Sequence, residues 1–277
     1  MSNWLDGKTC IVTGASGGMG AGIAATLIKK HGCRVIGVAR SETKMLKFIE
    51  ELGPTYAEQF HISFLMISKN ENWVNFVKEL EEENINVDVL VNNAGILPKF
   101  KRFDRYEMDE IEKAININFY SCVYSTKALL PMLMKSSDPG IINIDSSAAL
   151  MSLAGTSMYS ASKAALKGFT ESLREEFRGK IYVGLVCPGF TKTDIFRDQK
   201  NDGGKGQKVM DMISTNCDTM VKLIMFGIEH KQALQVHGMD AHAMNVFGKL
   251  LPVNGSRLFS AIMKAADIDL FSEVFKD

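Results

Sequence analysis

The sequence predicts an α/β protein in which helices cover both faces of a parallel sheet, and two observations support this. Short runs rich in valine and isoleucine recur along the chain and are typical of strands buried on both sides. Longer amphipathic stretches alternate with these runs, which favours a doubly wound sheet of seven parallel strands. Because no low-complexity linker or internal repeat interrupts the alternation, we expect residues 1–277 to form a single domain.

Each expected strand is a short apolar run, and each expected helix is a longer segment with apolar residues at helical spacing. The first strand reads KTCIVT, the second RVIGVA, the fourth VDVLV, the fifth GIINI and the sixth IYVGLV. In chain order, the strands are expected at residues 8–13, 34–39, 60–67, 87–91, 140–144, 181–186 and 233–236. The helices between them are expected at residues 18–30, 42–52, 71–82, 115–134 and 157–177.

The composition excludes several classes of protein. Hydrophobic residues make up 46% and charged residues 23% of the chain, and the formal net charge is zero, so nothing indicates capture of nucleic acid. The five cysteines are odd in number and lack metal-site spacing, which favours free thiols in a reducing compartment and no bound metal. The N-terminus has no signal-like apolar region, and no stretch has the length of a membrane span. We therefore expect a cytoplasmic protein.

The octet TGASGGMG follows the first expected strand and opens the first expected helix. In this context, backbone N–H groups at a helix N-terminus can bind a phosphate. The octet does not fit the spacing G-x-G-x-x-G, because Ile23 stands where the third glycine belongs. It fits T-G-x-x-x-G-x-G through Thr13, Gly14, Gly18 and Gly20. The alternative is that these glycines only make a tight turn between strand and helix.

Three further motifs lie near the carboxyl ends of expected strands, where open α/β sheets bind ligands. NNAG at residues 92–95 ends the fourth strand, and CPGFTKT at residues 187–193 ends the sixth. YSASK places Tyr159 and Lys163 one helical turn apart, on the same face of a helix. With all four motifs in order, residues 8–193 resemble the short-chain dehydrogenase/reductase family in its most typical form. The resemblance implies a Rossmann-like fold.

The resemblance also implies a chemistry for Tyr159 and Lys163. Reduction of a ketone needs a hydride donor at the carbonyl carbon and a proton donor at the oxygen. A tyrosine hydroxyl can act as this general acid or base when a nearby positive charge favours the phenolate. Lys163 can supply that charge, and the resemblance implies that it also binds the nicotinamide ribose.

A serine and an asparagine complete the catalytic set that the resemblance implies. The family's serine lies thirteen residues before the tyrosine, which selects Ser146 over Ser147. The family usually has serine where this chain has Asp145. This aspartate could make the surroundings of Ser146 more acidic, but we favour the interpretation that it caps a turn at the strand end. Of the two asparagines in ININFYS, Asn118 matches the family and Asn116 is incidental.

The end of the second strand indicates which dinucleotide binds. Relatives that use NAD have an acidic residue at this point, whereas this chain has Ala39, followed by Arg40 and Ser41. The guanidinium of Arg40 could bind a 2′-phosphate, which favours NADP(H) over NAD(H), although Arg40 could also be a solvated charge. The aspartate that the family places after the third strand is missing, since Met66 or Ile67 stands there.

The resemblance implies contacts along the whole cofactor. It assigns the 2′-phosphate side to Arg40 and Ser41. The remaining assignments are Gly14, Ser16, Gly18, Met19 and Gly20 at the pyrophosphate, Asn92, Ala94 and Gly95 at the adenosine ribose, Tyr159 and Lys163 at the nicotinamide ribose, and Pro188, Gly189 and Thr193 at the nicotinamide.

Two regions that the family does not fix bear on the substrate. Residues 194–230 carry apolar residues, several of them methionines, at a spacing that suits either a lid or ordinary helix packing. Residues 238–277 form an amphipathic, helical C-terminal extension. This extension could cover the pocket, complete a subunit interface in a homodimer or homotetramer, or rest on a membrane. Its few basic residues favour membrane contact least.

These observations predict an NADP(H)-dependent oxidoreductase that interconverts a secondary alcohol and a ketone. A bulky apolar substrate, such as a hydroxysteroid or bile acid, is favoured by the methionine-rich lid and the apolar extension. The alternatives are a reductase of small or sugar-like ketones, and a non-catalytic regulator that senses NADP. Enoyl reduction is disfavoured, because that branch of the family usually spaces its tyrosine and lysine further apart.

Overall fold

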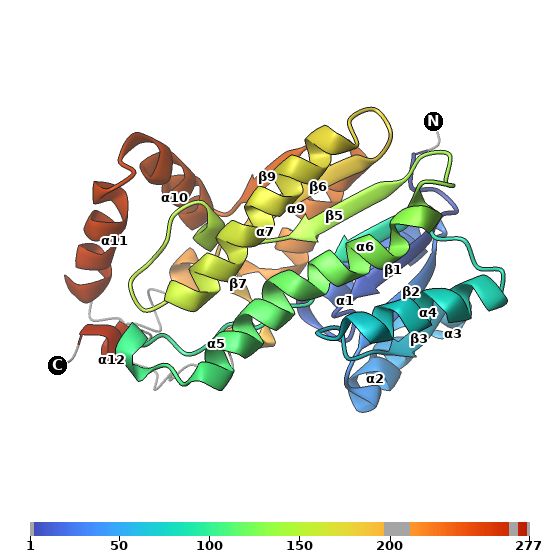
Figure 1. Ribbon diagram of the computed structural model, residues 1–277, viewed down its shortest axis with the longest axis horizontal. Helices are drawn as coiled ribbons and strands as arrows, with labels where there is room; N and C mark the ends of the chain where they lie inside the picture. Colours follow the sequence, from blue (N-terminus) through green and yellow to red (C-terminus); the bar gives the residue numbers. More distant parts are fainter. Residues whose placement is uncertain (1–2, 197–210, 266–270, 276–277) are drawn as a thin grey trace.

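Seven parallel strands form one sheet in the computed structural model, in the order β3-β2-β1-β4-β5-β6-β9 (Figure 1). The structure describes residues 3–196, 211–265 and 271–275. The strands are β1 (Thr9–Thr13), β2 (Arg34–Ala39), β3 (Phe60–Phe64), β4 (Val89–Asn92), β5 (Gly140–Ile144), β6 (Tyr182–Pro188) and β9 (Leu234–His237). All seven expected strands are therefore present, and the predicted doubly wound fold is confirmed. The strand order changes direction between β1 and β4, which is where such sheets bind their ligands.

Helices cover both faces of this sheet. Those within the sheet region are α1 (Gly18–His31), α2 (Glu42–Leu52), α3 (Pro54–Ala57), α4 (Asn70–Glu82), α5 (Met108–Ile115), α6 (Ser121–Leu133), α7 (Ser157–Glu176) and α9 (Cys217–Glu229). Buried side chains of α1 and α9, such as Leu27 and Ile224, pack on one face. Side chains of α4, α6 and α7, such as Trp73, Leu129 and Leu173, pack on the other, which faces the viewer in Figure 1.

The segment expected as one helix over residues 115–134 is interrupted. Helix α5 begins earlier, at Met108, where Glu107 and Glu110 form a capping box. A π-helical turn, Asn116–Tyr120, then separates α5 from α6. Such wide turns are frequent at functional sites, and this one contains the buried side chain of Asn118.

The expected lid over residues 194–230 divides into parts with different positions. Residues 197–210 lie outside the described residues. Two short strands, β7 (Thr191–Lys192) and β8 (Thr215–Asn216), pair beside the main sheet. Helix α9 does not act as a lid: its Val221 and Ile224 are buried in the core with α1, because α9 lies on that face of the sheet. Packing is so close that a Cβ on Gly22 of α1 would lie 2.7 Å from Val221.

The C-terminal extension forms three helices, α10 (Met239–Leu250), α11 (Asn254–Ala265) and α12 (Ser272–Phe275), which lie together at one end of the molecule (Figure 1). Buried residues of this extension, including Met244, Met263 and Phe271, form a separate apolar cluster. The same cluster contains Phe100 and Phe190 from loops that follow β4 and β6. The extension therefore packs beside the carboxyl ends of the strands.

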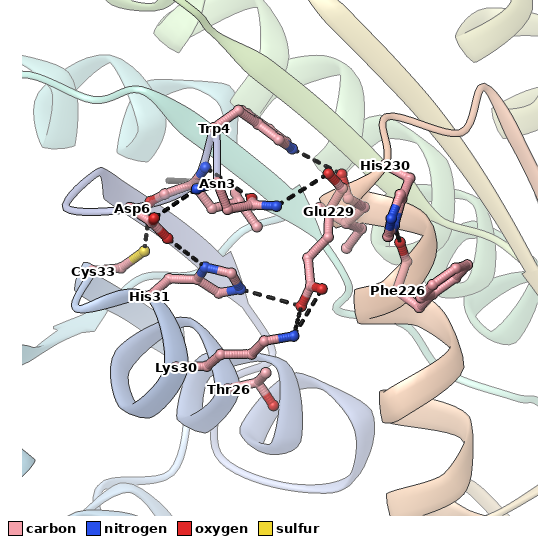
Figure 2. A network of polar contacts seen from close by, with 12 residues as sticks. Asn3, Trp4, Asp6, Thr26, Lys30, His31, Cys33, Phe226, Glu229 and His230 are labelled. Atoms are coloured by element: carbon pink, nitrogen blue, oxygen red, sulfur yellow. Dashed lines mark hydrogen bonds and ion pairs between the residues drawn. The ribbon is translucent and has the colours of Figure 1, made fainter. Parts of the chain in front are cut away.

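A network of ion pairs lies at the amino-terminal ends of the strands, which we name the amino edge of the sheet (Figure 2). His31, at the end of α1, has its Nδ1 2.8 Å from Asp6 and its Nε2 3.2 Å from Glu229, at the end of α9. Lys30 donates to the same Glu229 carboxylate at 2.7 Å. Trp4 donates from its indole to the carbonyl of Ile228 at 2.9 Å. These contacts join the N-terminal segment to α1 and α9.

Candidate active site

The glycine-rich octet forms a turn that is fixed to β4. Gly14 and Gly18 have φ angles of 69° and 54°, a region that favours glycine. The hydroxyl of Thr13 accepts hydrogen bonds from the backbone N–H groups of Asn93, at 2.9 Å, and Ala94, at 3.0 Å. Threonine at this position thus holds together the carboxyl ends of β1 and β4, which form the floor of the switch point.

The first turn of α1 offers backbone donors to a ligand. Its N-cap is Gly17, which has no side chain to bond these N–H groups, and this suits a phosphate at the helix N-terminus. A groove beside this turn, which we name the cofactor groove, is lined by Gly14, Ser16, Gly17, Gly18, Met19, Arg40, Lys44, Asn93, Ala94, Gly95, Ile96, Leu97, Thr193, Asp194 and Ile195. Gly20 has a packing role, because a Cβ there would collide with the carbonyl of Gly14 and the amide of Asn93. The groove brings together most of the residues that the sequence predicted at the phosphates.

Two basic side chains lie at one end of the cofactor groove. Arg40 is exposed and lines it, as the sequence predicted. Lys44, which the sequence analysis missed, also lines it and donates to Asp194 at 3.1 Å. Its signal was its position in the first turn of α2, four residues after Arg40. The hydroxyl of Ser41 accepts from the backbone N–H of Lys44 at 3.3 Å, so this side chain caps α2.

The neighbouring asparagines in NNAG have different roles. Asn92, which the sequence placed at the ribose, is 2% exposed and points into the interior. Its amide donates to Asn143 at 2.9 Å and accepts from the Ser125 hydroxyl at 2.7 Å. Alternation along β4 directs it toward the covered face, and Asn93 lines the groove in its place.

Ser146, Tyr159 and Lys163 line a second hollow, which we name the catalytic pocket. The Lys163 side chain is buried, with its Nζ donating to the carbonyl of Ile144 at 3.1 Å and lying 6.0 Å from the centre of the Tyr159 ring. The Ser146 hydroxyl accepts from the N–H of Ala148 at 3.1 Å, which leaves its own hydrogen available to a ligand. Pro188, Gly189 and Thr193 line the same pocket.

Asn118 lies behind this pocket, in the π-helical turn, and is fully buried. Its amide accepts from the N–H of Ile96 at 2.8 Å and donates to the carbonyl of Ile96 at 3.0 Å. It also donates to Ser162 at 3.1 Å, whose hydroxyl donates to the carbonyl of Tyr159 at 2.7 Å. Asn118 therefore connects the loop after β4 with the helix that carries Tyr159 and Lys163.

Asp145, next to Ser146, departs from the expected role as a turn cap. It is 4% exposed, and neither of its carboxylate oxygens has a hydrogen-bond partner among the described residues. Burial raises its pKa to about 8, although the ammonium groups of Lys163 and Lys167 act to lower it. Asp145 directly follows the last residue of β5, and the two ammonium groups that act on it both belong to α7. This carboxyl is a buried, unpaired group at the pocket wall.

The remaining walls of the catalytic pocket are mainly apolar. They include Phe100 and Leu153, together with Phe190 and Phe196 from the segment after β6. Met244 of α10 completes the wall, so the C-terminal extension lines the pocket. From the sequence alone this is one of three possible roles, because apolar periodicity does not indicate what a helix covers.

Two other structural features bear on the class of protein. No helix in the described ranges has the length and apolar character needed to cross a membrane. Residues 3–196, 211–265 and 271–275 contain no cluster of three or more histidine, cysteine, aspartate or glutamate side chains that could hold a metal ion.

Comparisons with known proteins agree with this geometry. The profile of the family described as short chain dehydrogenase matches residues 8–203. SadH of Mycobacterium tuberculosis (strain CDC 1551 / Oshkosh), described as an oxidoreductase, is 29% identical over 266 residues, which cover 93% of this chain and 95% of SadH. The 3-oxoacyl-acyl-carrier-protein reductase FabG of Vibrio harveyi is 36% identical over 199 residues, which cover 72% of this chain and 79% of FabG.

A solved structure is also similar. It is a short chain dehydrogenase from Shigella flexneri 2a str. 301 in complex with NADP, with a TM-score of 0.66 and 25% sequence identity. The match covers 72% of this chain and 86% of that protein. The similarity in structure thus includes a protein that binds a nicotinamide dinucleotide.

Proposed function

We propose that this chain, which belongs to the short chain dehydrogenase family of oxidoreductases, interconverts a secondary alcohol and a ketone with NADP(H). One observation carries the proposal: Ser146, Tyr159 and Lys163 line an apolar pocket that adjoins the cofactor groove. Met19, Gly95 and Thr193 line both hollows, so a dinucleotide in the groove would reach the pocket.

The residues present fit a dinucleotide with a 2′-phosphate. The turn at Gly14 and Gly18 leaves room for a pyrophosphate against the N-terminus of α1. Arg40 and Lys44 can both bind a phosphate at the adenosine end. The carboxylate that NAD-binding relatives have at this end could not do so. The complex of the Shigella flexneri relative with NADP supports the same choice.

Each catalytic side chain has a role in ketone reduction. When NADPH is bound, its nicotinamide would supply a hydride to the carbonyl carbon. The Ser146 hydroxyl donates a hydrogen bond to the carbonyl oxygen, and the Tyr159 hydroxyl transfers its proton to that oxygen. The buried ammonium of Lys163 stabilises the phenolate that remains. Asn118 holds the backbone of Ile96 and, through Ser162, the helix turn of Tyr159. In alcohol oxidation the proton moves in the opposite direction.

The pocket walls favour a bulky apolar substrate such as a hydroxysteroid or bile acid. Phe100, Leu153, Phe190 and Met244 offer a large carbon skeleton apolar contact. A sugar-like ketone would place its hydroxyl groups against the same side chains without hydrogen-bond partners, at a cost of about 1–3 kcal/mol for each. Small ketones would leave most of the apolar wall in contact with water.

Assembly and location form part of the proposal. The exposed apolar residues Leu250 and Val253 of the extension support self-association as a homodimer or homotetramer. The five cysteines are free thiols, which suits the reducing cytoplasm. The partner of the enzyme would then be a small-molecule substrate and a second copy of the chain.

A substrate screen tests this function. The purified full chain would be mixed with NADPH or NADH and a panel of keto-steroids, keto-sugars and small ketones, and the loss of nicotinamide absorbance would be followed. We expect turnover of at least one keto-steroid, with a higher kcat/KM for NADPH than for NADH. A preference for NADH would contradict the role of Arg40. NADPH binding without turnover of any substrate would instead support a non-catalytic, NADP-sensing regulator.

A further inference from the structure

Asp240 lies in the first turn of α10 and is 8% exposed, outside the catalytic set. Its carboxylate fits between two glycines that come from different parts of the chain. A Cβ on Gly238 would lie 2.7 Å from Oδ1, and a Cβ on Gly189 would overlap both carboxylate oxygens. Any other residue at position 189 would therefore displace the Asp240 side chain.

Asp240 binds the backbone of the loop that follows β6. Its Oδ2 accepts from the N–H of Phe190 at 2.7 Å, in a buried position. The same loop is held by the N–H of Gly189, which donates to the carbonyl of His237 at 2.8 Å. Its other side is held by the carbonyl of Phe190, which accepts from the N–H of Thr215 at 2.8 Å. The Thr191 hydroxyl also donates to the carbonyl of Gly189, at 3.0 Å, whereas the side chain of Asp240 reaches the loop from the C-terminal extension.

The other carboxylate oxygen, Oδ1, has no hydrogen-bond partner among the described residues. Burial raises the pKa of this carboxyl, although the N–H groups of Phe190 and Ala241 act to lower it. A buried polar atom without a partner is costly, so packing alone does not account for an aspartate here. An apolar side chain of similar size would fill the same space but would offer no acceptor to the N–H of Phe190.

The loop held in this way carries groups from both parts of the site. Pro188 and Gly189 line the catalytic pocket at the end where the nicotinamide would lie, and Phe190 forms part of its apolar wall. Helix α10, which carries Asp240, supplies Met244 to the same wall, where it belongs to one apolar cluster with Phe190. One carboxylate thus fixes the nicotinamide side of the pocket to the substrate side.

We propose that Asp240 is a positioning residue for hydride transfer, which acts by holding Pro188, Gly189 and Phe190 against the C-terminal extension. The inference rests on the proposed function, since it concerns the nicotinamide side of the same site. Small displacements of groups around reacting atoms can lower rates by roughly 100-fold. Asp240 is not among the residues that line the cofactor groove, so the adenosine end of the groove, at Arg40 and Lys44, serves as an internal reference.

The test compares two ligands in full-length variants. Asp240→Leu removes the acceptor, Asp240→Asn keeps one, and Glu229→Gln at the far edge of the sheet controls for lost stability. Dissociation constants would be measured for NADPH and for 2′-phospho-ADP-ribose, which lacks the nicotinamide. We expect Asp240→Leu to weaken NADPH about tenfold or more and 2′-phospho-ADP-ribose less than about twofold. Asp240→Asn should restore most of the NADPH affinity.

Turnover gives a second readout, taken well below the melting temperature of each variant. We expect kcat for ketone reduction to fall about tenfold or more in Asp240→Leu, while Glu229→Gln keeps the wild-type value. Equal weakening of both ligands, or a lowered melting temperature with unchanged NADPH affinity and kcat, would overturn the proposal. If Asp240→Leu does not fold, Asp240→Ser is used with the same expectations, since its hydroxyl is too short to reach Phe190.

The binding comparison needs no substrate. If the wild-type protein binds NADPH but reduces no ketone, the proposed function fails, and the two ligands still decide the role of Asp240. If ketone reduction is found and the two ligands weaken together, only the inference about Asp240 fails.

Discussion

Buried charged groups have partners at the amino edge of the sheet but lack some of them at the carboxyl-terminal ends of the strands, the carboxyl edge. At the amino edge, the buried ring of His31 lies between the carboxylates of Asp6 and Glu229, and Lys30 completes the network (Figure 2). At the carboxyl edge, the buried carboxyls of Asp145 and Asp240 have oxygens without partners among the described residues. Paired charges at the amino edge support the fold. Of the three described side chains with buried atoms that lack a partner, Asp145 and Asp240 lie at the edge where such sheets bind ligands, and Arg34 lies at the start of β2.

The pKa shifts of the two edges also have opposite signs. Burial alone would raise the pKa of Glu229, but hydrogen bonds from Lys30 and His31 outweigh it and lower the pKa below its ordinary value. Burial raises the pKa of Asp145 to about 8. As the pH rises, the carboxyl group of Glu229 at the amino edge therefore adds stability, whereas that of Asp145 at the carboxyl edge removes stability.

The largest expected effect is on turnover, from Tyr159→Phe. This change removes the hydroxyl that transfers the proton, so kcat for ketone reduction should fall by about 100-fold to 10,000-fold. NADPH affinity and the melting temperature should change little, because the ring remains. Steady-state kinetics and a thermal melt measure both, and unchanged turnover would contradict the mechanism.

Cofactor choice gives the next largest effect. In the double variant Arg40→Leu and Lys44→Leu, the KM for NADPH should rise about 10-fold to 100-fold, because two charged donors to the 2′-phosphate are lost. The KM for NADH, which has no such phosphate, should stay within about twofold. A matched control is Lys47→Leu, a change on the same helix at a residue outside the cofactor groove. An equal rise for both cofactors would remove the basis for the NADP(H) assignment.

At the amino edge, His31→Leu should affect stability and not catalysis. Loss of the buried bridge to Glu229 should lower the free energy of unfolding by about 1–3 kcal/mol, since Glu229 keeps Lys30 as a partner. Urea denaturation measures this change, and kcat of the folded variant should equal that of the wild type. A large loss of kcat at unchanged stability would mean that the two edges are not separate in function.

The pH dependence of stability should separate the two edges further. Asp145 has a folded-state pKa of about 8 and an ordinary value of 3.8, so its favourable contribution is fully present below 3.8 and is lost as the pH rises to about 8. We expect Asp145→Ser to gain stability relative to the wild type between pH 5 and pH 8.5, as followed by urea midpoints. A constant difference across this range would show that Asp145 does not titrate as its burial implies.

The smallest expected effect is the acid response of Glu229. Its folded-state pKa lies below its ordinary value of 4.5, so its contribution is present above 4.5 and is lost as the pH falls through the lower, folded value. The difference in melting temperature between the wild type and Glu229→Gln should therefore shrink in acid. A difference that grows as the pH falls would reverse the assigned direction.

The sequence predicted the sheet well because buried parallel strands are continuous Val/Ile runs, and β2 and β5 match their expected bounds. It did not predict the π-helical turn, in which the side chain of Asn118 bonds to the backbone of Ile96, a residue distant in sequence. The spacing of the motifs that the family shares identified Ser146, Tyr159 and Lys163, which line the catalytic pocket. It could not separate Asn92 from Asn93, because only the alternation of β4 decides which side chain faces the groove.

The buried carboxyls were less accessible to sequence reasoning. Asp145 looked like a turn cap, since aspartate after a strand commonly has that role. It is 4% exposed in the structure, and no local sequence pattern records this burial. Asp240 carried no motif at all, and only the approach of Gly189 and Gly238 to its carboxylate marks it.

Transfer of an isotope label tests the central claim most directly. The wild-type protein would reduce the best ketone of the panel with NADPH deuterated at both C4 positions, and the alcohol would be analysed by mass spectrometry and NMR. Hydride transfer in the catalytic pocket predicts one deuterium on the carbinol carbon of the product. An alcohol without deuterium at that carbon would contradict the account.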